Sequence, residues 1–285
     1  MYQEQPGKKI LCVSEKNPGT FSQRANDFLG TIKKGEQLGI FDMDQSLLQA
    51  GVDIEDIARD KFGLIPSFMK LAWQEEIAKF SKISNEHVTH SLRKIHFLYY
   101  PNSITSELAP HMQLPIGNPI TKIAMKNLGR SIGNYVYQEN LYRPIAIDVL
   151  KECNQKGIRP VIATASTIDL ADGFITTLMP AFGLDKIDFV GSELQYKKDM
   201  TEIQYFSGQP KTDFVRECKR TGAIVVIGVG DKPDTSDAFI KECVIQGRIN
   251  NATPHKGNDD WKSIQKRILL YQQLPTSIVG TLIGT

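Results

Sequence analysis

The chain lacks several features that would place it in a large class of proteins. Its four cysteines, Cys12, Cys153, Cys218 and Cys243, lie far apart and form no Cys-x-x-Cys pair. Neither a zinc site nor a disulfide framework is therefore indicated, and we expect buried thiols in a reducing compartment. Charge of one sign is not in excess, since 34 Lys and Arg face 32 Asp and Glu. A nucleic-acid binder is disfavoured because it needs a broad basic surface.

Long apolar runs are also missing. The first residues, "MYQEQPGKKI", do not show the basic-then-apolar order of a secretory signal, and no stretch approaches the roughly 20 apolar residues that span a bilayer. We therefore expect a cytoplasmic protein without a membrane span. Export by a route that uses no cleaved signal stays open.

The second half of the chain alternates between helical patterns and short apolar runs. The helical patterns cover residues 143–157, 167–183, 209–222 and 234–243, and the apolar runs cover 158–166, 186–194 and 223–231. Such alternation predicts an α/β fold, a Rossmann-like parallel sheet with helices on both faces. With 285 residues, 41% of them hydrophobic, the chain can bury a core of this kind.

The first half of the chain is organised differently. Residues 37–42 read as a short buried strand, and almost a hundred residues of mainly helical pattern follow Ser46. The simplest architecture is an α/β core, residues 1–46 plus 143–285, with an all-helical domain of residues 47–142 inserted after that strand. Residues 1–36 form an N-terminal extension in which a strand near 8–14 and a helix near 20–34, capped by Thr20, are predicted.

Polar side chains gather where the predicted strands end, the edge at which parallel sheets bind ligands. They are Asp42 and Asp44, then Thr164 and Ser166, then Asp231 with Asp234 and Asp237, and Lys211 opens the helix before the last strand. Each has an ordinary explanation on its own, because an Asp-x-Asp after a strand is most often a turn or a helix cap, and a single Lys is most often on the surface. Four such coincidences at one edge favour a functional site.

These residue types together suit phosphoryl transfer. An Asp carboxylate can attack phosphorus and form an aspartyl phosphate, which divides one difficult displacement into two easier ones. Because an anion then approaches an anion, the reaction needs Mg²⁺ held by a few carboxylates. A Lys and a hydroxyl stabilise the transferred group, and a second carboxylate can protonate the leaving oxygen and later activate water.

The pattern resembles the haloacid dehalogenase superfamily of phosphohydrolases, in its phosphoserine-phosphatase-like branch. The matching motifs are Asp42-Met43-Asp44-Gln45-Ser46, Thr164 in "PVIATAS", Lys211 in "SGQPKTDF" and Gly230-Asp231. The resemblance implies that Asp42 is the nucleophile, that Asp44 is the general acid/base and that Thr164 and Lys211 hold the phosphoryl group. It also implies Mg²⁺ bound by Asp42, Asp231 and the backbone carbonyl of Asp44.

The fourth motif departs from the family pattern. The family commonly has a second acid four or five residues after the first, where this chain has Thr235 and Ser236 between Asp234 and Asp237. We choose Asp234 as the second metal contact, and Asp237 remains the alternative. The helical insertion resembles the family's cap domain, which sets substrate specificity.

Three functions fit these residues. The leading one is a Mg²⁺-dependent phosphomonoester phosphatase that acts on a small phosphorylated metabolite. A phosphoprotein phosphatase of the same chemistry is the second, and a non-catalytic binding protein on the same fold is the third. A receiver domain of a signalling relay fits less well, because it would carry its acid pair and acceptor Asp on different strands.

Overall fold

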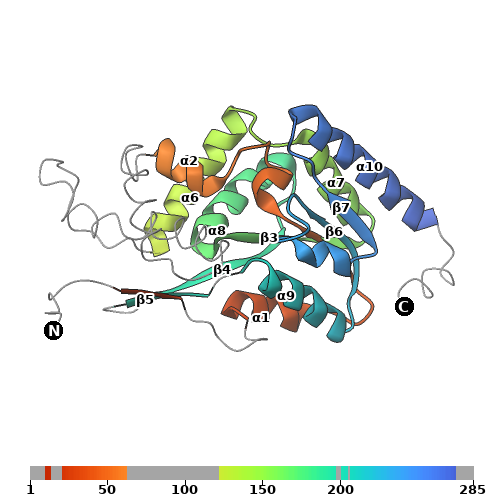
Figure 1. The fold of residues 1–285 in the computed structure, drawn as a ribbon, viewed down its shortest axis with the longest axis horizontal. Coiled ribbons are helices and arrows are strands. Elements are labelled where there is room, and N and C mark those ends of the chain that lie inside the picture. The colour runs from red at the N-terminus through yellow and green to blue at the C-terminus, as the bar shows by residue number, and fades with distance from the viewer. Residues whose placement is uncertain (1–9, 14–20, 63–121, 197–199, 205, 274–285) are drawn as a thin grey trace, which may run out of the picture.

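The computed structural model describes residues 10–13, 21–62, 122–196, 200–204 and 206–273. Its strands form one seven-stranded sheet in the order β1-β5-β4-β3-β2-β6-β7 (Figure 1). The strands are β1 (Ile10–Val13), β2 (Gln37–Phe41), β3 (Ile158–Thr167), β4 (Asp188–Tyr196), β5 (Met200–Gln204), β6 (Ile224–Gly230) and β7 (Ile245–Arg248). The run β4-β3-β2-β6-β7 is parallel throughout, which confirms the predicted α/β class.

Helices cover both faces of the sheet, as predicted (Figure 1). They are α1 (Gln23–Thr31), α2 (Ile54–Asp60), α6 (Lys122–Gln138), α7 (Pro144–Gln155), α8 (Ile168–Leu178), α9 (Gln209–Arg220) and α10 (Pro254–Gln273). On one face α7, α8 and α10 pack on the strands, and on the other face α1 and α9 do so. None of the helices in the described ranges has both the length and the apolar character needed to cross a bilayer.

Local sequence explains where several helices begin and end. Pro144 occupies the first turn of α7, where its missing N–H costs nothing, and Gly157 follows the helix with a φ of 75° that favours glycine. Asp53 caps α2 by accepting hydrogen bonds from the backbone N–H groups of Glu55, at 2.9 Å, and Asp56, at 3.4 Å.

The N-terminal segment belongs to the folded core. β1 pairs in parallel with β5, and α1 packs its buried Ala25 and Phe28 into a hydrophobic cluster shared with Phe214 of α9. The predicted helix is present, but its cap is Ser22, whose hydroxyl accepts the Ala25 N–H at 3.2 Å. The expectation that Thr20 caps the helix was wrong, because the helix starts later.

The two described ends of the insertion lie on the core. Ile54 and Ala58 of α2, and Ile132 and Val136 of α6, are buried in the hydrophobic cluster that also contains Phe41 of β2. Helix α6 packs along α8. Residues 63–121, which make up the middle of the predicted cap domain, lie outside the described residues, so the cap domain with its limits at 47 and 142 remains a prediction.

Three elements differ from the sequence expectation. Strands β5 and β7 were not predicted, and β5, which lies between β1 and β4, runs antiparallel to β4. A regular helix over 234–243 was predicted, but the segment holds only a short 3-10 turn at Ala238–Glu242. The loop before that turn leads to Asp237, whose carboxylate contacts Lys211.

The expectation of buried thiols is confirmed for three of the four cysteines. Cys153, Cys218 and Cys243 are buried free thiols, and burial raises the pKa of each to about 12. Such thiols stay protonated and unreactive near neutral pH. The side chain of Cys12 lies outside the described residues.

Candidate functional site

The first part of the site is the turn that follows β2. The backbone N–H of Asp42 donates to the carbonyl of Val229 on β6 at 2.8 Å, so the sheet still holds the residue that carries the carboxylate. Gln45 then adopts a φ of 58°, which reverses the chain after Asp44. The Ser46 hydroxyl donates to Asp42 Oδ2 at 3.1 Å. Asp42 is therefore fixed at both its backbone and its side chain.

Lys211 lies between two buried carboxylates. Its Nζ donates to Asp42 Oδ1 at 2.7 Å and to Asp237 Oδ1 at 2.8 Å. The three side chains are almost fully buried, with 1% of Lys211, 8% of Asp42 and 1% of Asp237 exposed. A buried ammonium survives in such a place because the carboxylates compensate its lost hydration. They hold the pKa of Lys211 above its ordinary value although burial opposes this.

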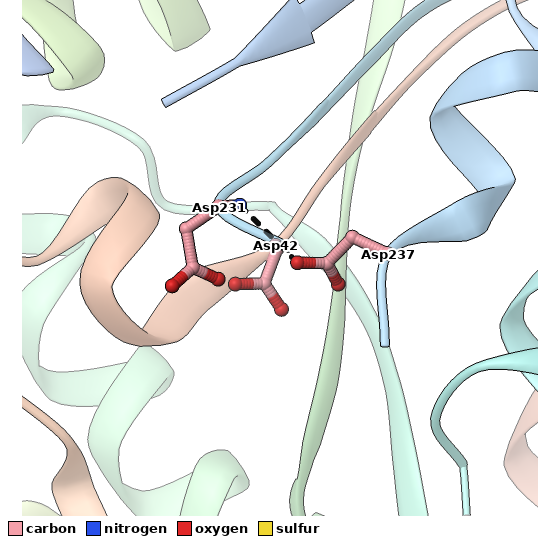
Figure 2. A group of neighbouring side chains, drawn as sticks. All are labelled: Asp42, Asp231 and Asp237. Carbon is pink, nitrogen blue, oxygen red and sulfur yellow. Dashed lines mark hydrogen bonds between the residues drawn. The ribbon is translucent and has the colours of Figure 1, made fainter. Parts of the chain in front are cut away.

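Asp42, Asp231 and Asp237 form an acidic cluster (Figure 2). Each offers one carboxylate oxygen, and these oxygens lie within 4.8 Å of one another. Asp237 Oδ2 also accepts the backbone N–H groups of Asp231, at 3.2 Å, and Lys232, at 3.1 Å, so this loop is closed on itself. Three carboxylates face the buried ammonium of Lys211 and the half-exposed ammonium of Lys232, which lies 3.9 Å from Asp231 Oδ2, so negative charge is in excess.

The electrostatics of this acidic cluster favour a cation. Burial and the carboxylate of Asp237 raise the pKa of Asp42 to about 7, although Lys211 opposes the rise. Burial also raises the pKa of Asp231 to about 6, while Lys232 acts in the opposite direction. A divalent cation would relieve this repulsion, and clustered carboxylate oxygens are the ligands that Mg²⁺ prefers. The donor set of the cluster thus fits a hard cation.

Asp44 lies on the other side of the turn, beside the end of β3. Its Oδ2 accepts the Ser166 hydroxyl at 3.0 Å and lies 3.4 Å from the Thr164 hydroxyl, and its Oδ1 accepts the Ile54 N–H at 3.1 Å. Thr164 and Ser166 are fully buried or nearly so. The carboxylate of Asp44 is therefore shared between the strand-end hydroxyls and the first turn of α2, the first helix of the insertion.

The structure brings most of the expected site residues together and separates one. Asp42, Asp44, Thr164, Lys211 and Asp231 converge at the carboxyl edge of the parallel strands. Asp234, chosen from the sequence as the second metal contact, is 71% exposed, and its carboxylate pairs with Lys241 at 3.1 Å. The position in the acidic cluster belongs to Asp237, because the loop folds back through hydrogen bonds from the Thr235 and Asp237 N–H groups to the Lys232 carbonyl.

Two further polar residues support the site and were missed in the sequence. Ser192 on β4, fully buried, donates to the Ala165 carbonyl at 2.7 Å and accepts the Phe206 N–H at 3.1 Å. Asn251, after β7, donates to Asp231 Oδ2 at 3.3 Å. No local pattern marks either residue, because each acts through partners distant in the sequence.

Comparison with known proteins gave matches among solved structures alone. No family model and no curated protein matches the chain. A haloacid dehalogenase (HAD) family hydrolase from Salmonella enterica serovar Typhi matches with 14% identity and a TM-score of 0.46, over 78% of this chain and 64% of that one. A phosphoserine phosphohydrolase-like protein from Francisella tularensis matches with 17% identity and a TM-score of 0.41, over 80% and 92%.

Phosphoserine phosphatase from T. onnurineus also matches, with 11% identity and a TM-score of 0.39, over 83% of this chain and 98% of that one. The three descriptions name the family, or the branch, that the sequence motifs resemble. The roles proposed for the site residues rest on the geometry of this chain.

Proposed function

We propose that the chain is a haloacid-dehalogenase-type, Mg²⁺-dependent phosphomonoester phosphatase that works through an aspartyl-phosphate intermediate. The observation that carries this proposal is the placement of Asp42, whose carboxylate contacts the Lys211 ammonium at 2.7 Å and belongs to the acidic cluster. A nucleophilic carboxylate needs both positive charge for the incoming phosphoryl group and a fixed direction of attack. Lys211 and Ser46 support both requirements.

The residues of this chain divide the reaction among them. Asp42 attacks phosphorus, and the bond from phosphorus to the leaving oxygen breaks. Asp44 donates a proton to that oxygen and then accepts one from the water that hydrolyses the aspartyl phosphate. Lys211 and the hydroxyl of Thr164 stabilise the charge on the transferred group. Mg²⁺, when held by Asp42, Asp231 and Asp237, would neutralise negative charge where the anions meet.

The geometry supports this division of roles. Asp44 and Thr164 lie 3.4 Å apart across the strand end, and Asp44 is held by two elements, β3 and the first turn of α2. A general acid/base needs a fixed orientation more than deep burial. We further propose a small phosphorylated metabolite as the substrate.

The test is hydrolysis of a generic aryl phosphate by the purified full chain, with Mg²⁺ and with EDTA. Asp42→Asn keeps the shape and removes the nucleophile, so we expect activity to fall by at least about 10³-fold, within the range typical of losing one essential group. Asp234→Asn is the matched control, because this exposed carboxylate stands apart from the acidic cluster. It should keep activity within about twofold, as surface changes usually do.

A second measurement is needed for the case in which the aryl ester is too large to reach Asp42. Binding of Mg²⁺ and of orthovanadate, a phosphate analogue, is measured by calorimetry on the same preparation. Equal activity in Asp42→Asn and wild type would overturn the proposal. So would a wild-type protein that neither hydrolyses the ester nor binds either probe, and a non-catalytic binding protein would then be the better reading.

A further inference from the structure

Arg143 is buried where the insertion rejoins the core. Only 2% of the residue is exposed, and the carboxylates whose charge acts on its guanidinium are those of Asp260 and Asp231. Its backbone N–H donates to the Leu47 carbonyl at 2.9 Å, and its Nε donates to the Leu48 carbonyl at 3.0 Å. Both carbonyls belong to the segment by which the chain leaves the core. Arg143, where the chain re-enters the core after the insertion, therefore hydrogen-bonds Leu47 and Leu48, where the chain leaves it.

The other end of the guanidinium reaches the loop after β7 and the first turns of α10. One terminal nitrogen donates to Asn251 Oδ1 at 2.7 Å, and the other donates to Asn258 Oδ1 at 3.3 Å. Gly257 lies directly over this group, since a Cβ there would stand 2.5 Å from a guanidinium nitrogen. The absence of a side chain at Gly257 thus makes room for the guanidinium.

Asn251 also hydrogen-bonds a member of the acidic cluster. Its Nδ2 donates to Asp231 Oδ2 at 3.3 Å. An arginine has donors only and an ionised carboxylate has acceptors only, so a group between them must offer one of each. An amide does so in one orientation, with its oxygen toward Arg143 and its nitrogen toward Asp231. The orientation of Asn251 is therefore set by the chemistry of its two neighbours.

We propose that Asn251, held by Arg143, is a positioning residue that fixes the Asp231 carboxylate for binding a divalent cation. The inference rests on the proposed function, in which Asp231 is a ligand of Mg²⁺. Residues that orient a ligating side chain typically change metal affinity by about 10–100-fold when they are removed. Because Arg143 also holds Leu47 and Leu48, the same residue joins the base of the insertion to the cation site.

The experiment measures Mg²⁺ affinity by isothermal titration calorimetry on the full chain, without substrate. Asn251→Ala should weaken binding by about 10–100-fold, in the range for such orienting residues. The melting temperature without Mg²⁺ should fall in this variant as it does in Asn258→Ala, because each removes one acceptor from the buried guanidinium. Asn258→Ala is the matched control: it removes an amide from the same guanidinium but has no contact with Asp231. Its Mg²⁺ affinity should stay within about threefold of wild type, as expected for a residue that does not orient a ligand.

A second variant tests whether Arg143 acts through Asn251. Arg143→Lys keeps the charge but loses the planar fork that reaches Asn251, so it should also weaken Mg²⁺ binding. Combined with Asn251→Ala it should add no further loss, because residues that act in series are not additive. If Arg143→Lys does not fold, Asn251→Ala and Asn258→Ala decide the question.

The outcomes separate this inference from the proposed function. Asp231→Asn should abolish Mg²⁺ binding, and if it binds as tightly as wild type, the proposed cation site itself is wrong. If Asp231→Asn loses binding while Asn251→Ala binds like wild type, the cation site stands and the positioning role of Asn251 is overturned. Equal losses in Asn251→Ala and Asn258→Ala would likewise overturn it, because the effect would then be a general one on the loop.

Discussion

At the scale of single residues, the sequence could predict the groups that follow a strong local signal. Asp42 and Asp231 each end an apolar run, and Lys211 opens a helix, so their meeting follows from the parallel sheet. The choice between Asp234 and Asp237 could not be made in this way. It depends on how the Lys232 carbonyl folds the loop back, and no spacing rule encodes that turn.

Ser192 offers a test of a residue that sequence patterns do not reveal. Its hydroxyl links the Ala165 carbonyl, beside Thr164, to the Phe206 N–H, in the segment that precedes Lys211. Ser192→Ala would leave the buried Phe206 N–H and the partly buried Ala165 carbonyl without this partner, which typically costs about 1–3 kcal/mol. We expect the free energy of unfolding in urea to fall by about that amount.

The matched control for Ser192 is Ser131→Ala. Ser131 is exposed on α6, and its hydroxyl donates to the Asn127 carbonyl of its own helix at 3.3 Å. Its substitution should change the free energy of unfolding by less than about 0.5 kcal/mol, as surface changes usually do. A Ser192→Ala protein as stable as wild type would contradict the bridging role of this hydroxyl.

At the scale of elements, strongly apolar segments were predictable, the short edge strand β1 among them, and short strands with few apolar residues were not. β3 and β6 carry continuous apolar runs because both of their faces are covered. β5, "MTEIQ", and β7, "IQGR", are five and four residues long and have few apolar residues, so only their partners in the sheet make them strands. The segment 234–243 looked helical, but its Asp237 is held by Lys211 and by the loop backbone instead.

The contact between α6 and α8 depends on glycine. A Cβ on Gly173 of α8 would stand 1.9 Å from the Lys126 carbonyl oxygen, and one on Gly129 of α6 would stand 2.1 Å from the Leu170 carbonyl oxygen. The backbones of the two helices therefore approach more closely at these positions than any residue other than glycine allows. This crossing attaches the last helix of the insertion to the helix that follows Thr164.

Gly173→Ala should therefore destabilise the protein. Alanine normally favours a helix by about 1 kcal/mol over glycine, but here the methyl group meets backbone atoms that cannot rotate away. Overpacking of this kind costs about 1–3 kcal/mol or more, and we expect a corresponding fall in the free energy of urea unfolding. The effect is expected with and without Mg²⁺.

Gly30→Ala supplies the opposite case on another helix. A Cβ on Gly30, in α1, has no atom within 4 Å, so the helical preference of alanine should act alone. Its stability should be unchanged or higher, by up to about 1 kcal/mol. Should Gly173→Ala also prove neutral or stabilising, the close crossing of α6 and α8 would be wrong.

At the scale of the whole molecule, the N-terminal extension behaves as part of the core. The sequence suggested a strand and a helix there but gave no reason to place them. The reason is non-local: Phe28 contacts Phe214 of α9, and the Arg159 guanidinium of β3 lies 4.7 Å above the Phe28 ring. Helix α1 thereby covers a face of the sheet that α9 alone leaves open (Figure 1).

Two truncations test this placement. A chain that starts at residue 20 loses β1 and keeps α1, and it should retain a cooperative urea transition because β1 is the outermost strand of the sheet and pairs with β5. A chain that starts at residue 37 also loses α1, which exposes the hydrophobic cluster around Phe214. We expect it to lose cooperativity and to bind a dye for exposed apolar surface.

Phe28→Ala in the full chain separates the effect of packing from that of chain length. It should lower the free energy of unfolding by about 3–5 kcal/mol, as large buried aromatic truncations do. If the chain starting at 37 unfolds with the same midpoint and slope as the full chain, α1 contributes nothing to the fold, and the sheet must be stable with that face exposed to water.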